Sequence, residues 1–301
     1  MKNRGMLLVL FIVFGLFISG CVFGPGGSEE TNIGGVDMKI MEGRPPTDFI
    51  IENQNFDIAI QLTNNIPRAV NNVEVCVEDL PSDIYGGIQG NPCKTVSLLA
   101  ATEFEGAVDP YVQERPVEFE AEPYINLKNS GVKDTNFLVT LTYSLVSSSR
   151  TNVCLFRDIS VVPEDFDCSV KTTYLGNEIN SDFAPLIVDQ IESQIVPDGD
   201  QNRIVLDIYF RKDTTGLVID LNTKKPRFGV DVSFTNTESD FTCGPLTEDD
   251  KIDMSDITKK IRCNSLFDLT SPYYTDSLNI DMDYTYRVSV PIRDVKLEPL
   301  A

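Results

Sequence analysis

Seven cysteines and a large excess of carboxylates are the residues of this 301-residue chain that are best suited to chemistry. The chain has no histidine, so it cannot form a Ser-His-Asp triad, a Cys-His nucleophile pair or a His-containing zinc site. Paired carboxylates could still serve a glycosidase, but among 46 acidic residues some pair always lies near another by chance. No cleft motif accompanies any pair. We therefore expect a protein that is not an enzyme, with a secreted hydrolase as an alternative.

The N-terminus has the layout of a secretory signal. Lys2 and Arg4 precede an apolar run over residues 6–17, and Cys21 stands where a cleavage site is expected. The segment resembles the lipobox of lipoproteins, in which the cysteine is lipidated and becomes the mature N-terminus. The resemblance implies a signal peptide over residues 1–21 and lipidation of Cys21.

An uncleaved transmembrane helix is the alternative for this anchor, because an apolar run of about 20 residues can span a bilayer. Against it, Gly24-Pro25-Gly26-Gly27 would break a helix and reads as a spacer. We expect a flexible linker over residues 22–35. Both alternatives place the remaining chain at the extracellular face of the cell membrane, anchored at its N-terminus.

The other six cysteines fall in sequential pairs, which fits an oxidising compartment. Six cysteines allow 15 connectivities, and neighbour pairing is favoured only by proximity. A metal cluster is the alternative, but no pair has CxxC spacing. The predicted disulfide cysteines are Cys76 and Cys93, Cys154 and Cys168, and Cys243 and Cys263.

Two further groups of residues are candidates for binding. Five carboxylates on one loop suit Ca²⁺, which takes six to eight oxygen ligands, although their spacing does not match an EF-hand and a solvated loop is the alternative. These are Glu248, Asp249, Asp250, Asp253 and Asp256. Tyr273 and Tyr274 follow a proline and present large rigid faces for binding, as do Tyr85, Tyr111 and Tyr124 in or near loops. The tyrosines could instead cover sheet edges. Apart from Ca²⁺, we expect no cofactor.

The formal net charge of -21 disfavours nucleic acid as a partner, because such a surface repels phosphates. Solubility of an exposed ectodomain is sufficient to explain this charge. The expected partners are the membrane, through an N-terminal lipid or helix, and other surface proteins.

Short segments that alternate apolar and polar residues predict β-strands throughout the chain. The clearest are 56–62, 73–78, 117–120, 137–143, 204–210, 230–234 and 280–290. A helical turn is expected over 255–261. The fold predicted is all-β, with two tandem immunoglobulin-like β-sandwiches over residues 36–168 and 169–301 after the N-terminal signal or anchor helix.

Two stretches carry a resemblance to known surface modules. Residues 56–77, with Asn64-Asn65 between an outgoing and a returning strand, resemble CARDB and related immunoglobulin-like modules of archaeal and bacterial surface proteins. The stretch from Cys154 to Val188 is similar to archaeal surface lipoproteins with two such modules. The resemblance implies an adhesion, scaffold or binding role. We therefore expect a membrane-anchored, non-enzymatic stalk or protein-binding module, with a surface lipoprotein that captures a ligand or Ca²⁺ as the alternative.

Overall fold

The computed structural model describes most of the chain after the predicted signal and linker. The described residues are 34–46, 49–79, 86–101, 103–104, 107–108, 114–131, 133–158, 160 and 170–300. The predicted signal and its lipidation residue Cys21 lie outside them. Residues Ile33–Ala301 form one compact unit. Across the described ranges, no helix has the length and apolarity needed to cross a bilayer.

The fold is almost entirely β, as the alternating segments predict. The predicted strand at 56–62 is β3 (Phe56–Asn64), whose inward-facing Ile58, Ile60 and Leu62 are fully buried. Period-two burial recurs in the other predicted strands because one face of each strand packs on a core and the other faces solvent. They include β4 (Val70–Asp79), β8 (Glu114–Ala121), β13 (Gln201–Lys212) and β15 (Arg227–Phe234).

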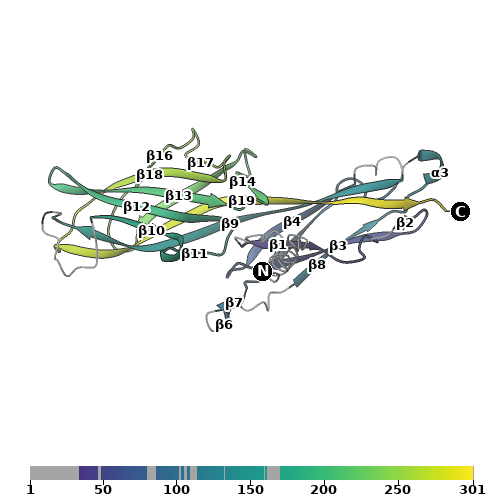
Figure 1. Cartoon of the computed structure of the whole chain (residues 1–301), viewed down its shortest axis with the longest axis horizontal. Coiled ribbons are helices and arrows are strands. Elements are labelled where there is room, and N and C mark those ends of the chain that lie inside the picture. Colours follow the sequence, from purple (N-terminus) through teal and green to yellow (C-terminus); the bar gives the residue numbers. More distant parts are fainter. Residues whose placement is uncertain are drawn as a thin grey trace, which may run out of the picture. The chain divides into compact units, whose positions relative to one another are not determined.

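The strands form three main sheets (Figure 1). The first sheet has the order β1-β3-β8, with β1 at Val36–Ile40. The second has the order β17-β15-β19-β9-β4-β5 and adds β17 (Ile252–Asp253), β19 (Tyr273–Glu298), β9 (Asp134–Phe156) and β5 (Cys93–Leu98). The third has the order β10-β12-β13-β18-β16 and adds β10 (Lys171–Leu175), β12 (Leu186–Asp198), β18 (Thr258–Phe267) and β16 (Thr242–Gly244).

Short elements complete the fold. Three small strands pair at the margins of the second sheet: β2 (Phe49–Ile51) and β14 (Gly216–Ile219) on β19, and β11 (Asn180–Ser181) on β9. A separate hairpin joins β6 (Glu103–Phe104) and β7 (Ala107–Val108). The helical elements described are the single turns α3 (Leu127–Ser130) and η1 (Gly176–Glu178).

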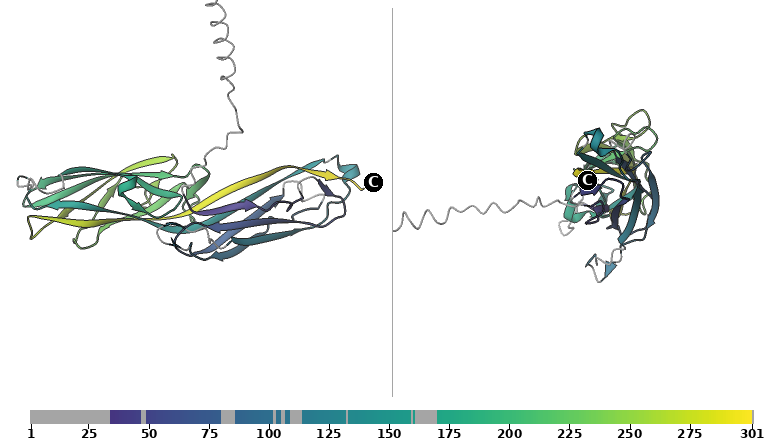
Figure 2. Two further views of the ribbon diagram at one scale, coloured as in Figure 1. Left: turned by 60° about the horizontal axis from the view of Figure 1, so that its bottom comes forward. Right: turned by 90° about the vertical axis from the view of Figure 1, so that its right-hand side faces the viewer.

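Two long strands, β9 and β19, hold the described fold together. They pair antiparallel from Asp134 with Lys296 to Phe156 with Tyr273, and Figure 2 shows the yellow β19 running alongside β9 between the two groups of strands. The first half of β9 pairs with β4, and its second half pairs with β11. Two sandwich-like halves therefore share one continuous two-stranded ladder.

Aromatic contacts show which sheets face each other in each half. In the first half, the rings of Phe56 on β3 and Phe137 on β9 lie 6.0 Å apart, so the first sheet packs on the second. In the second half, Phe210 on β13 and Phe228 on β15 lie 5.0 Å apart, so the third sheet also packs on the second. The buried apolar residues of both halves belong to one hydrophobic cluster.

The central ladder crosses the boundary predicted between residues 36–168 and 169–301. β9 belongs to the first range and β19 to the second, yet each contributes to both sandwich-like halves. The second half therefore lies between the two long strands in chain order, rather than following the first half as a separate tandem unit. Only the pairing between distant strands reveals this arrangement. The alternation of apolar and polar residues within one strand carries no information on which strand it pairs with.

Three local expectations differ from the structure. The helical turn expected over 255–261 is wrong, because β18 begins at Thr258 and pairs with β13. The last strand, expected over 280–290, is longer: β19 begins at Tyr273 and continues through Pro291 to Glu298. Proline is tolerated there because the flank of β19 away from β9 has no described partner between Val288 and Lys296.

The third difference concerns Gly34 and Gly35, the last residues of the predicted flexible linker, which are buried. A Cβ on Gly34 would lie 2.5 Å from the ring of Phe183, and one on Gly35 would lie 2.6 Å from Tyr143 Oη. Both glycines have positive φ, so a side chain at either position is also strained. The chain is therefore already held in the fold at this point.

Candidate binding site

Two of the three predicted disulfides are present between neighbouring cysteines. Cys76 pairs with Cys93 and Cys243 pairs with Cys263, each across two hydrogen-bonded strands in direct register. Cys154 is also disulfide-bonded, but Cys168, its predicted partner, lies outside the described residues. The disulfides brace edge strands β5 and β16 against their sheets.

The acidic loop does not gather its carboxylates for a cation. Asp249 accepts hydrogen bonds from Thr247 Oγ1 at 2.7 Å and Arg227 Nη1 at 2.5 Å, and these contacts lower its pKa. Asp253 Oδ1 accepts from the Ser255 backbone N–H at 2.8 Å, which lowers its pKa in the same way. These carboxylates hold a turn and an ion pair.

The possible metal ligands of the described chain do not cluster on this loop. Within the described chain, the one group of three His, Cys, Asp or Glu ligand atoms lying within 4.8 Å of one another is Glu74 with the disulfide-bonded Cys76 and Cys93. None of Glu248, Asp249, Asp250, Asp253 and Asp256 belongs to such a group. The geometry therefore gives the predicted Ca²⁺ site no support.

The tyrosines predicted to lie on loops separate into two kinds. Tyr273 and Tyr274 begin β19 and are 41% and 37% exposed, as a binding surface requires. Tyr124 is instead fully buried, with its hydroxyl donating to Asp79 Oδ2 at 2.6 Å. Its ring stacks on Phe56 at 5.5 Å, so burial of the aromatic face outweighs its loop position. Tyr85 and Tyr111 lie outside the described residues.

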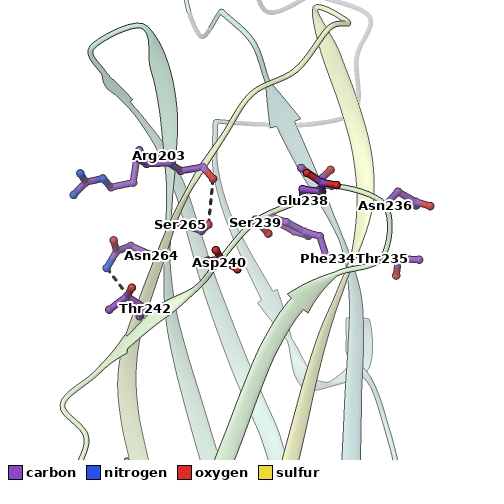
Figure 3. Close-up of a pocket in the computed structure, with 12 residues that line it drawn as sticks. Arg203, Phe234, Thr235, Asn236, Glu238, Ser239, Asp240, Thr242, Asn264 and Ser265 are labelled. Atoms are coloured by element: carbon purple, nitrogen blue, oxygen red, sulfur yellow. Dashed lines mark hydrogen bonds between the residues drawn. The ribbon is translucent and has the colours of Figure 1, made fainter.

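A polar groove lies between β15 and β16 in the second half. We call it the β15–β16 groove, and its volume is about 870 Å³. Figure 3 shows side chains of the β15–β16 loop on one side and those of β13, β16 and β18 on the other. Its lining residues are Arg203, Phe234, Thr235, Asn236, Thr237, Glu238, Ser239, Asp240, Thr242, Asn264, Ser265 and Leu266.

Tyr274 lines a second pocket that adjoins this groove. That pocket, of about 460 Å³, shares Asn236, Thr237, Glu238 and Leu266 with the groove and extends along residues 267–271. The predicted binding tyrosine therefore lies at one end of a continuous polar depression. The alternation of residues within β19 could not predict this position, because Asn236, Thr237 and Glu238 come from a distant part of the sequence.

One buried carboxylate holds the loop that forms a wall of the groove. Asp276 is 1% exposed, and it accepts hydrogen bonds from the backbone N–H groups of Asn236, Thr237 and Ser277. It also accepts from Asn236 Nδ2 at 3.1 Å and Thr237 Oγ1 at 2.6 Å. Asp276 is a positioning residue missed in the sequence, since no local motif relates it to residues 40 positions away.

These hydrogen bonds also set the ionisation of Asp276. Burial is the largest single influence and raises its pKa, but hydrogen bonds from Thr237, Ser277 and Asn236 together outweigh burial. The pKa of Asp276 is therefore lowered, and the carboxylate is ionised at neutral pH. A preorganised loop of this kind costs less conformational entropy when a ligand binds.

No family model and no curated protein matches this chain. The resemblance to CARDB modules and archaeal lipoproteins therefore stays a prediction.

Proposed function

We propose that this chain is a non-enzymatic, membrane-anchored cell-surface protein that acts as a binding or adhesion module. The observation that carries the proposal is the preorganised β15–β16 groove, with Tyr274 lining the pocket that adjoins it. Lipidation at Cys21, export, and immunoglobulin-like character of the two sandwich-like halves are parts of the same proposal. The two cross-strand disulfides support it, because such bonds persist in oxidising compartments.

The point at which the chain enters the fold favours a binding module over a stalk. The Val36 backbone N–H donates to Tyr143 Oη at 3.1 Å, and Tyr143 lies opposite Tyr286 near the middle of the β9–β19 ladder. A tether through Gly34 therefore joins the fold between its two halves. A stalk needs its attachment at one end.

The groove lies away from this attachment point. Along β19, Asp276 is about 30 Å from Tyr286 at roughly 3.3 Å per residue. A linker that ends before Gly34 would add reach, since an extended chain spans up to about 3.5 Å per residue. This spacing leaves the groove accessible to a partner on the same or a neighbouring surface.

The proposal is tested by site-specific photo-crosslinking on intact cells that make the full-length protein. A photoreactive residue replaces Tyr274, and the matched control replaces Val146, which is 47% exposed on β9. We expect a surface component crosslinked from position 274 and much less from position 146. Equal capture from both positions would contradict a role for the groove.

The anchor is tested separately by mass spectrometry of the mature N-terminus. We expect a chain that starts at Cys21 and carries a lipid mass. A chain in the membrane fraction that still starts at Met1 would instead support the uncleaved transmembrane helix. A chain protected from protease added outside intact cells would overturn the surface location.

A further inference from the structure

The lining of the β15–β16 groove favours a polar ligand. Every lining residue except Phe234 and Leu266 has a polar side chain, and these include hydroxyls, amides, carboxylates and one guanidinium. Pockets for drug-like ligands are instead lined mainly by apolar side chains. The volume of this groove nevertheless lies within their usual range of roughly 300–1,000 Å³. The ligand must therefore offer many hydrogen-bonding groups, both donors and acceptors.

The charges in the groove disfavour an anionic ligand. Glu238 and Asp240 are exposed on the loop, and the one lining cation, Arg203, already forms an ion pair with Asp198. A phosphate or carboxylate ligand would therefore meet uncompensated negative charge at the groove. Side-chain carboxylates are, however, good acceptors for neutral hydroxyl donors.

Two buried polar atoms in the groove wall have no hydrogen-bond partner among the described residues. They are Ser239 Oγ and Arg203 Nε. Buried polar atoms are paired in most native structures, so each such exception needs an explanation. Both residues line the groove (Figure 3), Arg203 from β13 and Ser239 from the β15–β16 loop. The two unpaired atoms are enclosed by protein, so a hydroxyl-rich ligand reaches them only if the loop shifts to expose them.

An aromatic face stands at the end of the polar depression. Tyr274 is 37% exposed and lines the adjoining pocket beside Thr270 and Ser271. A tyrosine ring gives a large rigid contact surface at low entropy cost. The C–H faces of a sugar ring are the apolar part of an otherwise hydroxylated molecule, and they match such a ring.

From these observations we infer that the β15–β16 groove and its adjoining pocket bind a neutral carbohydrate. The inference rests on the proposed binding function and names its ligand class. Side chains of Asn264 and Asp240 hydrogen-bond to neighbouring hydroxyls, and Tyr274 stacks on a sugar ring. Asp276 does not contact the ligand but holds the loop in position.

The inference is tested by calorimetry with the full-length protein in a detergent that has no sugar headgroup. The probes are neutral oligosaccharides of glucose, mannose, galactose and N-acetylglucosamine, with oligogalacturonate as the anionic comparison and an unstructured peptide as the protein-like comparison. We expect at least one neutral oligosaccharide to bind, and oligogalacturonate to bind at least about tenfold more weakly.

Variants then locate the site. Tyr274→Ala is expected to weaken binding of the neutral oligosaccharide about tenfold, whereas Tyr274→Phe keeps the ring and changes binding less than about threefold. Asn264→Ala is expected to weaken binding about fivefold or more. Tyr209→Ala, on the outer face of the third sheet, is the matched control and is expected to leave binding unchanged.

Two results would overturn the inference. One is that no neutral oligosaccharide binds the wild-type protein. The other is that binding is the same in the wild type, Tyr274→Ala and Asn264→Ala, with all three folded by circular dichroism. If the sugars or the variants fail in this way while crosslinking from position 274 on cells persists, the ligand class is wrong and the proposed binding function stands.

Discussion

Asp276 shows how one residue at a strand start controls a loop far away in sequence. Its carboxylate satisfies the backbone N–H groups of Asn236 and Thr237, which would otherwise be unpaired at the turn after β15. Because its pKa is lowered in the folded state, the ionised form contributes stability above the unfolded pKa of about 4. That contribution is lost as the pH falls through the folded pKa.

We predict that Asp276→Asn lowers the free energy of unfolding by about 2–3 kcal/mol at pH 7, because an amide NH₂ would face several donors. The difference from the wild type should shrink as the pH falls below about 4. Urea denaturation across this pH range measures both effects. Asp283→Asn, an exposed carboxylate on the same strand, is the control and should change stability by less than about 0.5 kcal/mol.

Asp79 has the opposite dependence on pH. Burial raises its pKa, and hydrogen bonds from Tyr124, Thr135 and the Ile88 backbone N–H only partly offset this. The folded state therefore keeps the Asp79 proton to higher pH than the unfolded state does. Its contribution to stability falls as the pH rises from the unfolded pKa of about 4 through the folded pKa.

We predict that Tyr124→Phe raises the pKa of Asp79 further, because it removes a donor to the carboxylate. The variant should lose about 1–2 kcal/mol of stability at pH 7 and less near pH 4, where Asp79 is protonated more often. Denaturation at the two pH values and NMR titration of Asp79 measure this, with Tyr209→Phe as control. An equal loss at both pH values would contradict the assigned network.

At the scale of elements, the disulfides act on edge strands. They close loops of 17 and 20 residues, for which the chain-entropy model gives nearly the same stabilisation of about 3 kcal/mol each. The sites differ in packing, since Cys263 is fully buried while Cys93 is exposed. Any difference between the stability losses on removing the two disulfides therefore reports how their cysteines pack in the folded state.

We predict that the double variant Cys243→Ala/Cys263→Ala loses more stability than Cys76→Ala/Cys93→Ala, because truncation at Cys263 also leaves space in the core. The expected losses are about 3–5 and 2–4 kcal/mol, measured by urea denaturation. Serine in place of alanine at Cys93 serves as a size control. The reverse order of losses would show that core packing at Cys263 is unimportant.

At the scale of the whole described fold, β9 and β19 couple the two halves. Thr285 lies at the joint, where β19 has β9 on one side and β14 on the other. A strand with both flanks paired cannot lose a backbone donor without breaking the ladder. The halves are therefore expected to unfold as one cooperative unit.

We predict a single calorimetric unfolding transition for the wild type and two transitions, or a loss above about 3 kcal/mol, for Thr285→Pro. Thr285→Val removes only the hydroxyl that bonds Ser144 Oγ at 2.9 Å, and it should keep one transition. Hydrogen exchange would show which half opens first. Two transitions in the wild type would mean that the halves fold independently despite the shared strands.

The position of most strands could be predicted from the order of residues, because alternation is a local property. The predicted strand over residues 204–210 lies in β13, and the one over 230–234 lies in β15. The predicted pairing of neighbouring cysteines is also confirmed where both partners are described, because the two cysteines of each pair lie on strands that are adjacent in a sheet. The exposure of Tyr273 and Tyr274 is likewise a local feature that the sequence predicts.

Which strands pair, and what gathers where they meet, depends on contacts between distant segments. The ladder between β9 and β19 joins residues about 140 positions apart at Ser144 and Thr285, and no local pattern encodes such a register. Tyr124 is a second example. Its loop sequence predicts a surface position, but contacts with distant residues bury its side chain in the core. The groove is assembled from β13, the β15–β16 loop and β18, so its chemistry exists only because the sheets bring those residues together.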